Sequence, residues 1–150
     1  MRIKKLVLSL FIIVILGCGD KVQVDKSQGE GIEIKKTYYS SGKLKWEQKF
    51  VNGELNGPSK GYYKNGKLER ELTFKNGKPD GLIKDYYENG NLEKERDYTN
   101  GKMLNGRMKI YRENGNIQGE AYYTDGKTKE LKRYFESGSL KDKRLNYIGF

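Results

Sequence analysis

Paired carboxylates are the residues of this chain whose type and spacing suit hydrolytic chemistry. Glu69 and Glu71 stand two positions apart, as do Glu93 and Glu95. On one face of a strand this spacing brings two carboxyl groups within the ~5 to 9 Å that glycoside hydrolysis requires. The same acids alternate with Lys and Arg and recur at equivalent places along the chain, which is typical of a solvated strand face. We therefore expect no catalytic residue and no enzymatic activity.

Composition removes most other kinds of reactive site. The 150 residues include no His and only one Cys. A Ser-His-Asp triad, a Cys-His pair, a His-containing zinc site and an internal disulfide therefore lack the residues to form them. No segment has the GxxxxGK[ST] spacing that cradles a phosphate group. The sequence predicts no metal and no cofactor.

The first 17 residues have the character of a secretion signal. Arg2, Lys4 and Lys5 precede an uncharged stretch, residues 6–17. As a helix this stretch would span roughly 18 Å against a hydrocarbon core of ~30 Å, so a cleaved signal is favoured over a permanent membrane span.

Cys18 follows this stretch directly, and the run Ile-Leu-Gly before it resembles the bacterial lipobox. The resemblance implies that Cys18 carries diacylglycerol and becomes the mature N-terminus; the alternative is a free Cys at the end of an ordinary signal. Residues 19–30 are polar and show no periodicity, which is typical of a tether. We expect a signal peptide over 1–17, a lipidated Cys and flexible tether over 18–30, and a repeat domain over 31–150.

This leader predicts a membrane-anchored lipoprotein of the cell envelope, on its periplasmic or extracellular face. The whole chain has a net charge of +10, and without residues 1–17 it keeps 27 Lys and Arg against 20 Asp and Glu, or +7. An exported basic surface suits an anionic envelope polymer or lipid headgroups, and export makes nucleic acid an unexpected ligand. The alternative is that Lys and Arg only keep an extended sheet soluble and its edges unpaired.

One unit of about 24 residues occurs five times. Three copies begin at Gly57, Gly81 and Gly106, a first copy lies in 31–56, and a degenerate one fills 131–150. In each copy a glycine is followed 11 residues later by a second one. The pairs are Gly42 and Gly53, Gly66 and Gly77, Gly90 and Gly101, Gly115 and Gly126, and Gly138 and Gly149.

These glycines predict an all-β chain of about ten short strands. Eight Asn-Gly pairs, together with Asp80-Gly81 and Asp125-Gly126, supply residues that tolerate positive φ at both central positions of a two-residue type I′ hairpin. With two turns and two strands in each copy, the sequence predicts an elongated antiparallel single-layer β-meander built from about five two-stranded repeats.

The turn positions also predict which residues lie opposite one another. Around Asn65-Gly66, Tyr63 should face Leu68 and Tyr62 should face Glu69. The other first turns pair Tyr39 with Leu44, Tyr87 with Leu92 and Phe135 with Leu140, and the second turns pair Phe50 with Leu55, Phe74 with Pro79 and Tyr98 with Met103. This register predicts one apolar face that carries Leu44, Trp46, Phe50, Leu68, Leu72 and Phe74, and a wet face that carries Lys67, Glu69, Glu71 and Thr73.

Every copy places one tyrosine on the face opposite Leu44, Leu68 and Leu92, next to Lys, Glu or Gln. These residues are Tyr38, Tyr62, Tyr86, Tyr111 and Tyr134. Aromatic side chains beside cations stack on sugars or bases and grip a protein partner, so they form a candidate binding stripe. The alternative is structural, because Tyr has a high strand propensity and packs well against its cross-strand neighbours.

The repeated Tyr-Tyr, Asn-Gly-Lys-Leu, Glu and final aromatic-x-x-Gly resemble the bacterial variant of the MORN repeat found in YwqK-like antitoxin components. The resemblance extends from about Gly31 to Gly149, with Arg112 in place of the second Tyr and Asn146 where an aromatic residue is expected. It implies an elongated, curved single-layer sheet that serves as a platform for protein or lipid contacts. We expect a lipid-anchored envelope scaffold that binds a protein or anionic envelope polymer without catalysis; the alternative is a toxin-neutralising antitoxin or immunity protein.

Overall fold

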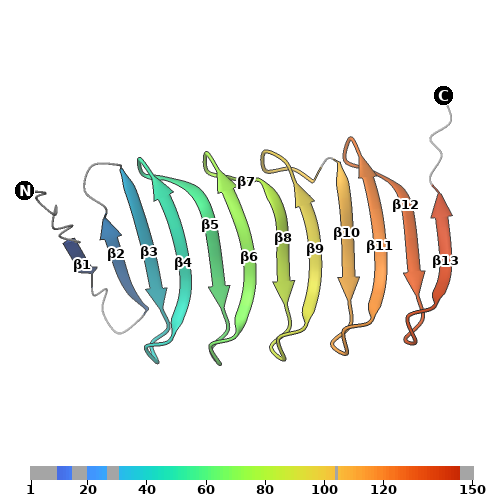
Figure 1. Cartoon of the computed structure of the whole chain (residues 1–150), viewed down its shortest axis with the longest axis horizontal. Coiled ribbons are helices and arrows are strands. Elements are labelled where there is room, and N and C mark those ends of the chain that lie inside the picture. Colours follow the sequence, from blue (N-terminus) through green and yellow to red (C-terminus); the bar gives the residue numbers. More distant parts are fainter. Residues whose placement is uncertain (1–9, 15–19, 27–30, 104, 146–150) are drawn as a thin grey trace, which may run out of the picture.

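A computed structural model of the chain describes residues 10–14, 20–26, 31–103 and 105–145. These residues form one open antiparallel sheet, which confirms the predicted all-β meander. Figure 1 shows the strands side by side in sequence order along the long axis of the molecule. The described part of the chain contains no helix, and so none long and apolar enough to span a membrane.

Each repeat contributes one pair of long strands to this sheet. The strands are β3 (Ile32–Tyr38), β4 (Leu44–Val51), β5 (Glu54–Tyr62), β6 (Leu68–Lys75), β8 (Gly81–Tyr86), β9 (Leu92–Tyr98), β10 (Gly106–Tyr111), β11 (Ile117–Thr124), β12 (Lys127–Tyr134) and β13 (Leu140–Leu145). A two-residue strand, β7 (Lys78–Pro79), pairs with the end of β6.

The second turn of each repeat has the predicted geometry. Asn52, Asn76, Asn100 and Asp125 have φ near +50°, and the glycine after each of them is also positive. These are the two left-handed residues of a type I′ turn. The predicted partners Phe50 and Leu55 face each other, as do Phe74 and Pro79. At the turn after β9, Thr99 bridges Lys102.

The first turns are one residue longer than predicted. In the loop after β5, the Gly66 amide donates to the Tyr63 carbonyl at 2.8 Å, and the Tyr63 amide donates to the Lys67 carbonyl at 2.8 Å. Only Gly66 has positive φ, so the loop is a type I turn closed by a left-handed glycine. Leu68 therefore lies opposite Tyr62 and not opposite Tyr63. The other first turns likewise pair Leu44 with Tyr38, Leu92 with Tyr86 and Leu140 with Tyr134.

A β-bulge then restores the predicted register for the rest of each strand pair. Opposite Gly61 and Tyr62 stand Arg70 and Leu68, so Glu69 is an extra residue on its strand. Beyond the bulge, Lys60 faces Glu71 as the turn arithmetic requires. The bulge moves Leu68 onto the face that carries Glu71, so the predicted single apolar face is wrong for Leu44, Leu68 and Leu92.

The sheet begins earlier than predicted. Lys21–Lys26 form strand β2, which pairs with β3, where the sequence analysis placed a tether before Gly31. Val22 and Val24 alternate with polar residues, and this two-residue period is typical of a strand. Leu10–Val14 form β1, which pairs with β2. Cys18 and the rest of the predicted leader lie outside the described residues, so the predicted cleavage and lipidation stay predictions.

We call the face that carries Glu71 the front face, and the opposite one the back face. The back face holds the deepest packing in the described chain, with Ile83, Ala121 and Ser59 buried. Trp46 lies directly over Gly61, where a Cβ atom would stand 2.8 Å from the indole ring. Also on this face, Asp85 is 5% exposed and forms ion pairs with Arg70 and Arg96.

Candidate binding face

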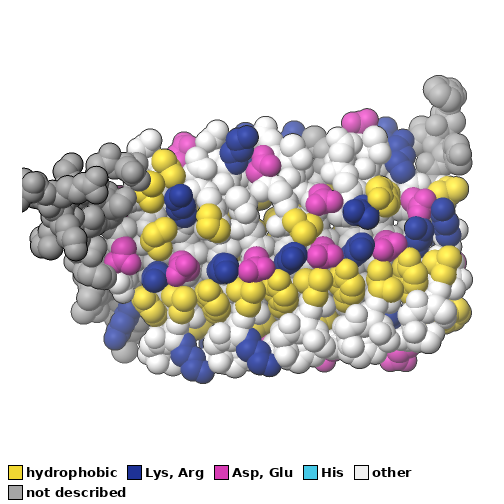
Figure 2. Space-filling view, in the orientation of Figure 1, with side chains coloured by type: hydrophobic (Ala, Val, Ile, Leu, Met, Phe, Trp, Pro, Cys, Tyr) yellow, Lys and Arg dark blue, Asp and Glu magenta, His cyan; other side chains and the backbone are white. Residues whose placement is uncertain are grey.

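The five predicted tyrosines lie together on the front face. Each is the last residue of its strand and faces the first residue of the next strand. We call this set of ten side chains the stripe: Tyr38, Tyr62, Tyr86, Tyr111 and Tyr134 with Leu44, Leu68, Leu92, Ile117 and Leu140. Figure 2 shows it as a continuous hydrophobic band across the sheet. The tyrosines and leucines share one face, whereas the sequence analysis placed them on opposite faces.

A row of charges runs beside the stripe along the middle of the strands. Its members face one another strand by strand, and their signs alternate across most of the sheet (Figure 2). We call this row the charge ladder: Lys36, Glu47, Lys60, Glu71, Lys84, Glu95, Lys109, Glu120, Lys132 and Lys143. The Lys36 Nζ lies 3.2 Å from the Glu47 Oε2, and the Lys60 Nζ lies 3.5 Å from the Glu71 Oε1. Each such pair is exposed and contributes only ~0.2 to 1 kcal/mol to folding.

Hydrogen bonds connect the stripe to the ladder. The Tyr86 hydroxyl donates to Glu71 at 2.9 Å, the Tyr111 hydroxyl to Glu95 at 3.0 Å and the Tyr134 hydroxyl to Glu120 at 2.9 Å. The Tyr38 hydroxyl donates to Gln23 at 3.2 Å. In three copies the acceptor is a ladder glutamate, whereas the acceptor of the Tyr38 hydroxyl lies on β2, in the segment that the sequence analysis placed in a tether.

Two of these hydroxyls ionise with difficulty. Burial, followed by the hydrogen bond to Glu71, raises the pKa of Tyr86 to about 12. Burial and the hydrogen bond to Glu95 raise the pKa of Tyr111 to about 12 in the same way. A neutral donor fixed on a carboxylate holds the ring in place, so these two tyrosines keep a fixed ring orientation on the front face.

The second aromatic of each repeat joins neighbouring repeats. The Tyr39 hydroxyl donates to the Tyr62 carbonyl at 2.7 Å, and the Tyr87 hydroxyl donates to the Tyr111 carbonyl at 2.8 Å. We call these bonds the staples. Tyr63 forms the same bond with the carbonyl of Tyr86.

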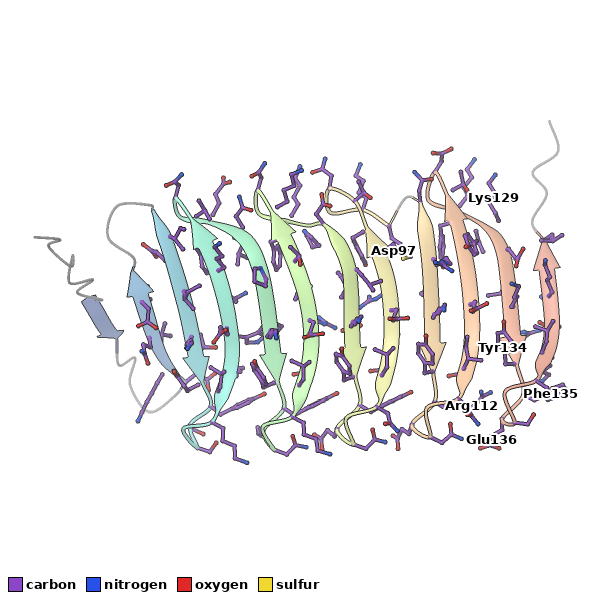
Figure 3. The ribbon with its side chains drawn as sticks, viewed as in Figure 1. Asp97, Arg112, Lys129, Tyr134, Phe135 and Glu136 are labelled. Atoms are coloured by element: carbon purple, nitrogen blue, oxygen red, sulfur yellow. The ribbon has the colours of Figure 1, made fainter. Side chains whose placement is uncertain are left out.

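The last two repeats vary the staple. Arg112 stands where the repeat has this Tyr, and its guanidinium donates to the Tyr134 carbonyl at 2.9 Å and to the Phe135 carbonyl at 3.3 Å (Figure 3). Phe135 occupies the same place in the last repeat, where no further repeat follows β13 in the described sheet. Its ring is 49% exposed. The departure of Arg112 from the repeat pattern therefore preserves the interaction.

The front face has shallow hollows beside the ladder. One of 230 Å³ is lined by Lys60, Glu71, Leu82 and Lys84 among others, and one of 150 Å³ by Leu82, Glu95, Asp97, Arg107 and Lys109. A hollow of 290 Å³ lies at the rim of the second turns, between Lys75 and Asn100. They are polar depressions on an open sheet and suit a surface contact better than an enclosed small molecule.

The carboxylates considered for hydrolysis are separated by the bulges. Glu71 and Glu95 belong to the ladder, whereas Glu69 and Glu93 are the extra residues of their strands and have no partner in the register. Within the described ranges, no three carboxylate or thiol side chains gather as metal ligands would.

Sequence reasoning missed the ladder, although the chain contains a signal for it. Lys and Glu stand 11 residues apart in four successive repeats, at 36 and 47, 60 and 71, 84 and 95, and 109 and 120. This is the same interval that separates the two glycines of a repeat. Sequence reasoning also missed the cluster of Arg70, Asp85 and Arg96, which spans two neighbouring repeats and gives no periodic signal.

Three segments of the chain match the MORN repeat variant: residues 55–76, 79–102 and 104–125. They coincide with the three central strand pairs, β5 and β6, β8 and β9, and β10 and β11. No curated protein matches the chain. The matched repeats agree with the resemblance drawn from the sequence over the centre of the sheet.

Proposed function

We propose that this chain is a non-catalytic β-repeat scaffold that holds a macromolecular partner against its front face. The stripe is the observation that carries the proposal. Its ten aromatic and aliphatic side chains form one continuous band, and at its C-terminal end Leu140 is 52% exposed. Covering such a band stabilises a complex by about 25 cal/mol per Å² of apolar surface removed from water.

The acids of the front face support binding over catalysis. Glu71 and Glu95 each accept a tyrosine hydroxyl and lie beside lysines of neighbouring strands. A general acid or nucleophile would need a carboxyl group that is free to reach a substrate. These two hold the stripe in position instead.

We further propose that Cys18 anchors the scaffold to a membrane of the cell envelope. The charged and then apolar leader and the lipobox-like residues support this part of the proposal. Cleavage before Cys18 would remove β1, and because β2 begins at Lys21, three residues after Cys18, the anchor would hold β2 close to the bilayer surface as the first strand of the mature sheet.

Both parts can be tested with the exported full chain. The mass of the mature N-terminus should show a diacylated Cys18, and an unmodified Met1 would remove the envelope location. For binding, wild-type protein and the double variant Leu68→Glu, Leu92→Glu are compared for retention of envelope components. Leu82→Glu is the matched control, since Leu82 is 43% exposed on the same face but outside the stripe.

We expect the stripe variant to lose the retained component and the control to keep it. Equal retention by both variants would contradict binding through the stripe. Retention of one secreted toxin would identify the narrower, toxin-neutralising function, whereas an envelope polymer or protein would identify a scaffold.

A further inference from the structure

The charge ladder has a symmetry that a second copy of the same face can use. Its signs alternate from Lys36 on β3 to Lys132 on β12. Consider a half-turn about an axis that runs parallel to the strands and passes between two neighbouring strands. The half-turn reverses the strand order but leaves each row at its own height along the strands, so ladder meets ladder and stripe meets stripe.

An axis between β6 and β8 makes the two ladders complementary. Glu71 of one copy then faces Lys84 of the other, and Lys60 faces Glu95. The next two pairs outward are Glu47 with Lys109 and Lys36 with Glu120. Each of these four opposite-charge pairs forms twice, because a two-fold interface is self-complementary.

Other face-to-face arrangements place like charges together. A half-turn about an axis across the strands puts each ladder residue opposite itself, Lys on Lys and Glu on Glu. An axis that runs along a strand, and not between two, does the same. Like-charge contacts of this kind cost several kcal/mol across an interface. The alternation of charges therefore favours arrangements in which the two-fold axis runs parallel to the strands and between two of them.

We propose that the front face docks onto the front face of a second copy of this chain, with the two-fold axis parallel to the strands and between β6 and β8. This inference rests on the proposed function, because it names the occupant of the same face. Two packed sheets lie about 10 Å apart with strand directions within about 30° of each other. Lys and Glu side chains that project from both sheets span that gap.

The stripe adds apolar contact to this charge pattern. The stripe residues on β3 to β11 of one copy meet the stripe of the other copy, so these parts of two half-exposed apolar bands leave water together, whereas Tyr134 and Leu140 lie beyond this overlap. Beyond the ladder, the exposed Leu82 of one copy lies opposite Thr73 of the other. The same row contains one like-charged pair, Lys49 with Arg107, on the two strands that also carry the Glu47 and Lys109 pair, so its repulsion offsets part of that contact.

Sedimentation of the full chain in density-matched detergent tests the dimer through a charge exchange. Lys60→Glu and Glu95→Lys should each weaken dimerisation by about tenfold or more, which corresponds to ~1.4 kcal/mol. The double variant should return close to the wild-type dissociation constant. Within one chain, β6 and β8 lie between Lys60 and Glu95, a separation of about 14 Å that salt screens. Recovery therefore reports a contact between copies.

The double variant Lys60→Glu, Glu120→Lys is the matched control. Glu120 belongs to the same ladder and accepts a tyrosine hydroxyl as Glu95 does, but the proposed axis does not place it opposite Lys60. This control should be at least as weak as the single variants, because Glu120→Lys also sets a like charge opposite Lys36 of the other copy. A wild-type chain that remains monomeric, or equal recovery by both double variants, would overturn the proposal. A monomer that still retains an envelope component through its stripe would leave the proposed function standing without this partner.

Discussion

At the residue scale, the tyrosine hydroxyl does two jobs in this chain. On the front face it donates to a carboxylate of the ladder, as Tyr86 does to Glu71. One residue later in the repeat it donates to a backbone carbonyl of the neighbouring repeat, as Tyr87 does to Tyr111. Both bonds need the neutral, protonated hydroxyl. The high tyrosine content therefore has a structural role, beside the binding role that we propose for the stripe.

The front-face hydroxyls make the sheet sensitive to high pH. The folded pKa values of Tyr86 and Tyr111 are about 12, above the value of 10 for a free tyrosine. Because the pKa is raised in the folded state, the contribution of these two hydroxyls to the free energy of unfolding is fully present below pH 10. It is lost as the pH rises towards 12. In a titration followed by phenolate absorbance, two of the twelve tyrosines should ionise well after the exposed ones.

The variant Glu71→Gln assigns this behaviour to one residue. It removes the acceptor charge but leaves the burial, so the pKa of Tyr86 should fall part of the way towards 10. Glu54→Gln is the control, because Glu54 is exposed at the start of β5, next to the second turn of its repeat. A late-ionising fraction that is unchanged in Glu71→Gln would show that the charge of Glu71 does not contribute to the raised pKa of Tyr86.

At the element scale, the staples add to the backbone hydrogen bonds and side-chain contacts that join neighbouring strand pairs. The pairing between β6 and β8 covers Arg70 with Asp85 and Glu71 with Lys84. The staple from Tyr63 to the carbonyl of Tyr86 closes the first-turn end of this same boundary. The staples therefore contribute most to stability at boundaries where the two strands share few backbone pairs.

Removing one staple should lower stability without changing the fold. Tyr87→Phe leaves the Tyr111 carbonyl without its hydroxyl donor and should cost about 1 kcal/mol, or a few degrees in Tm. Tyr122→Phe is the matched control, since Tyr122 is 44% exposed and its ring lies on Arg107. Thermal unfolding of both variants measures the difference. Equal Tm values would mean that water replaces the staple at no cost.

The turns show how far the sequence could predict these elements. Asn-Gly at the second turns adopts the type I′ geometry that its positive φ tolerance predicts. At three of the five first turns the same dipeptide forms a longer loop. In the loop after β5, for example, the Asn65 side chain accepts the Lys67 amide at 2.8 Å and only Gly66 needs positive φ. Asn-Gly favours both loops, so the dipeptide alone could not decide between them.

The prediction of the candidate site depended on the same ambiguity between the two loop types. The tyrosines were placed on the correct face because the bulge restores the register of the strand bodies. The leucines were misplaced because no residue type marks the bulge, where the extra residue is Lys45, Glu69, Glu93, Gln118 or Lys141 in the five repeats. Strand β2 was missed because the alternation of Val22 and Val24 covers too few residues to stand out from a polar segment.

At the scale of the whole molecule, the sheet is a one-dimensional array. Each strand pairs only with its neighbours, and no strand from one end returns to the other. Stability in such an array is a sum of repeat and nearest-neighbour contributions. The charge pairs of the ladder and the staples each join adjacent strands or adjacent repeats. The array should therefore tolerate the loss of one complete repeat.

Deletion of residues 81–105 tests this description. It removes β8 and β9, joins Asp80 to Gly106 in the same Asp-Gly pair, places Lys109 beside Glu71 and offers the Tyr111 carbonyl to Tyr63. The shortened chain should keep its β-rich circular dichroism and unfold cooperatively at a lower Tm. Deletion of residues 81–91 is the control. It removes β8 alone and sets β9 parallel to β6 without the dozen or more residues that a parallel crossover needs, so this variant should fail to fold. Loss of structure in the first deletion would show that the sheet depends on contacts beyond nearest neighbours.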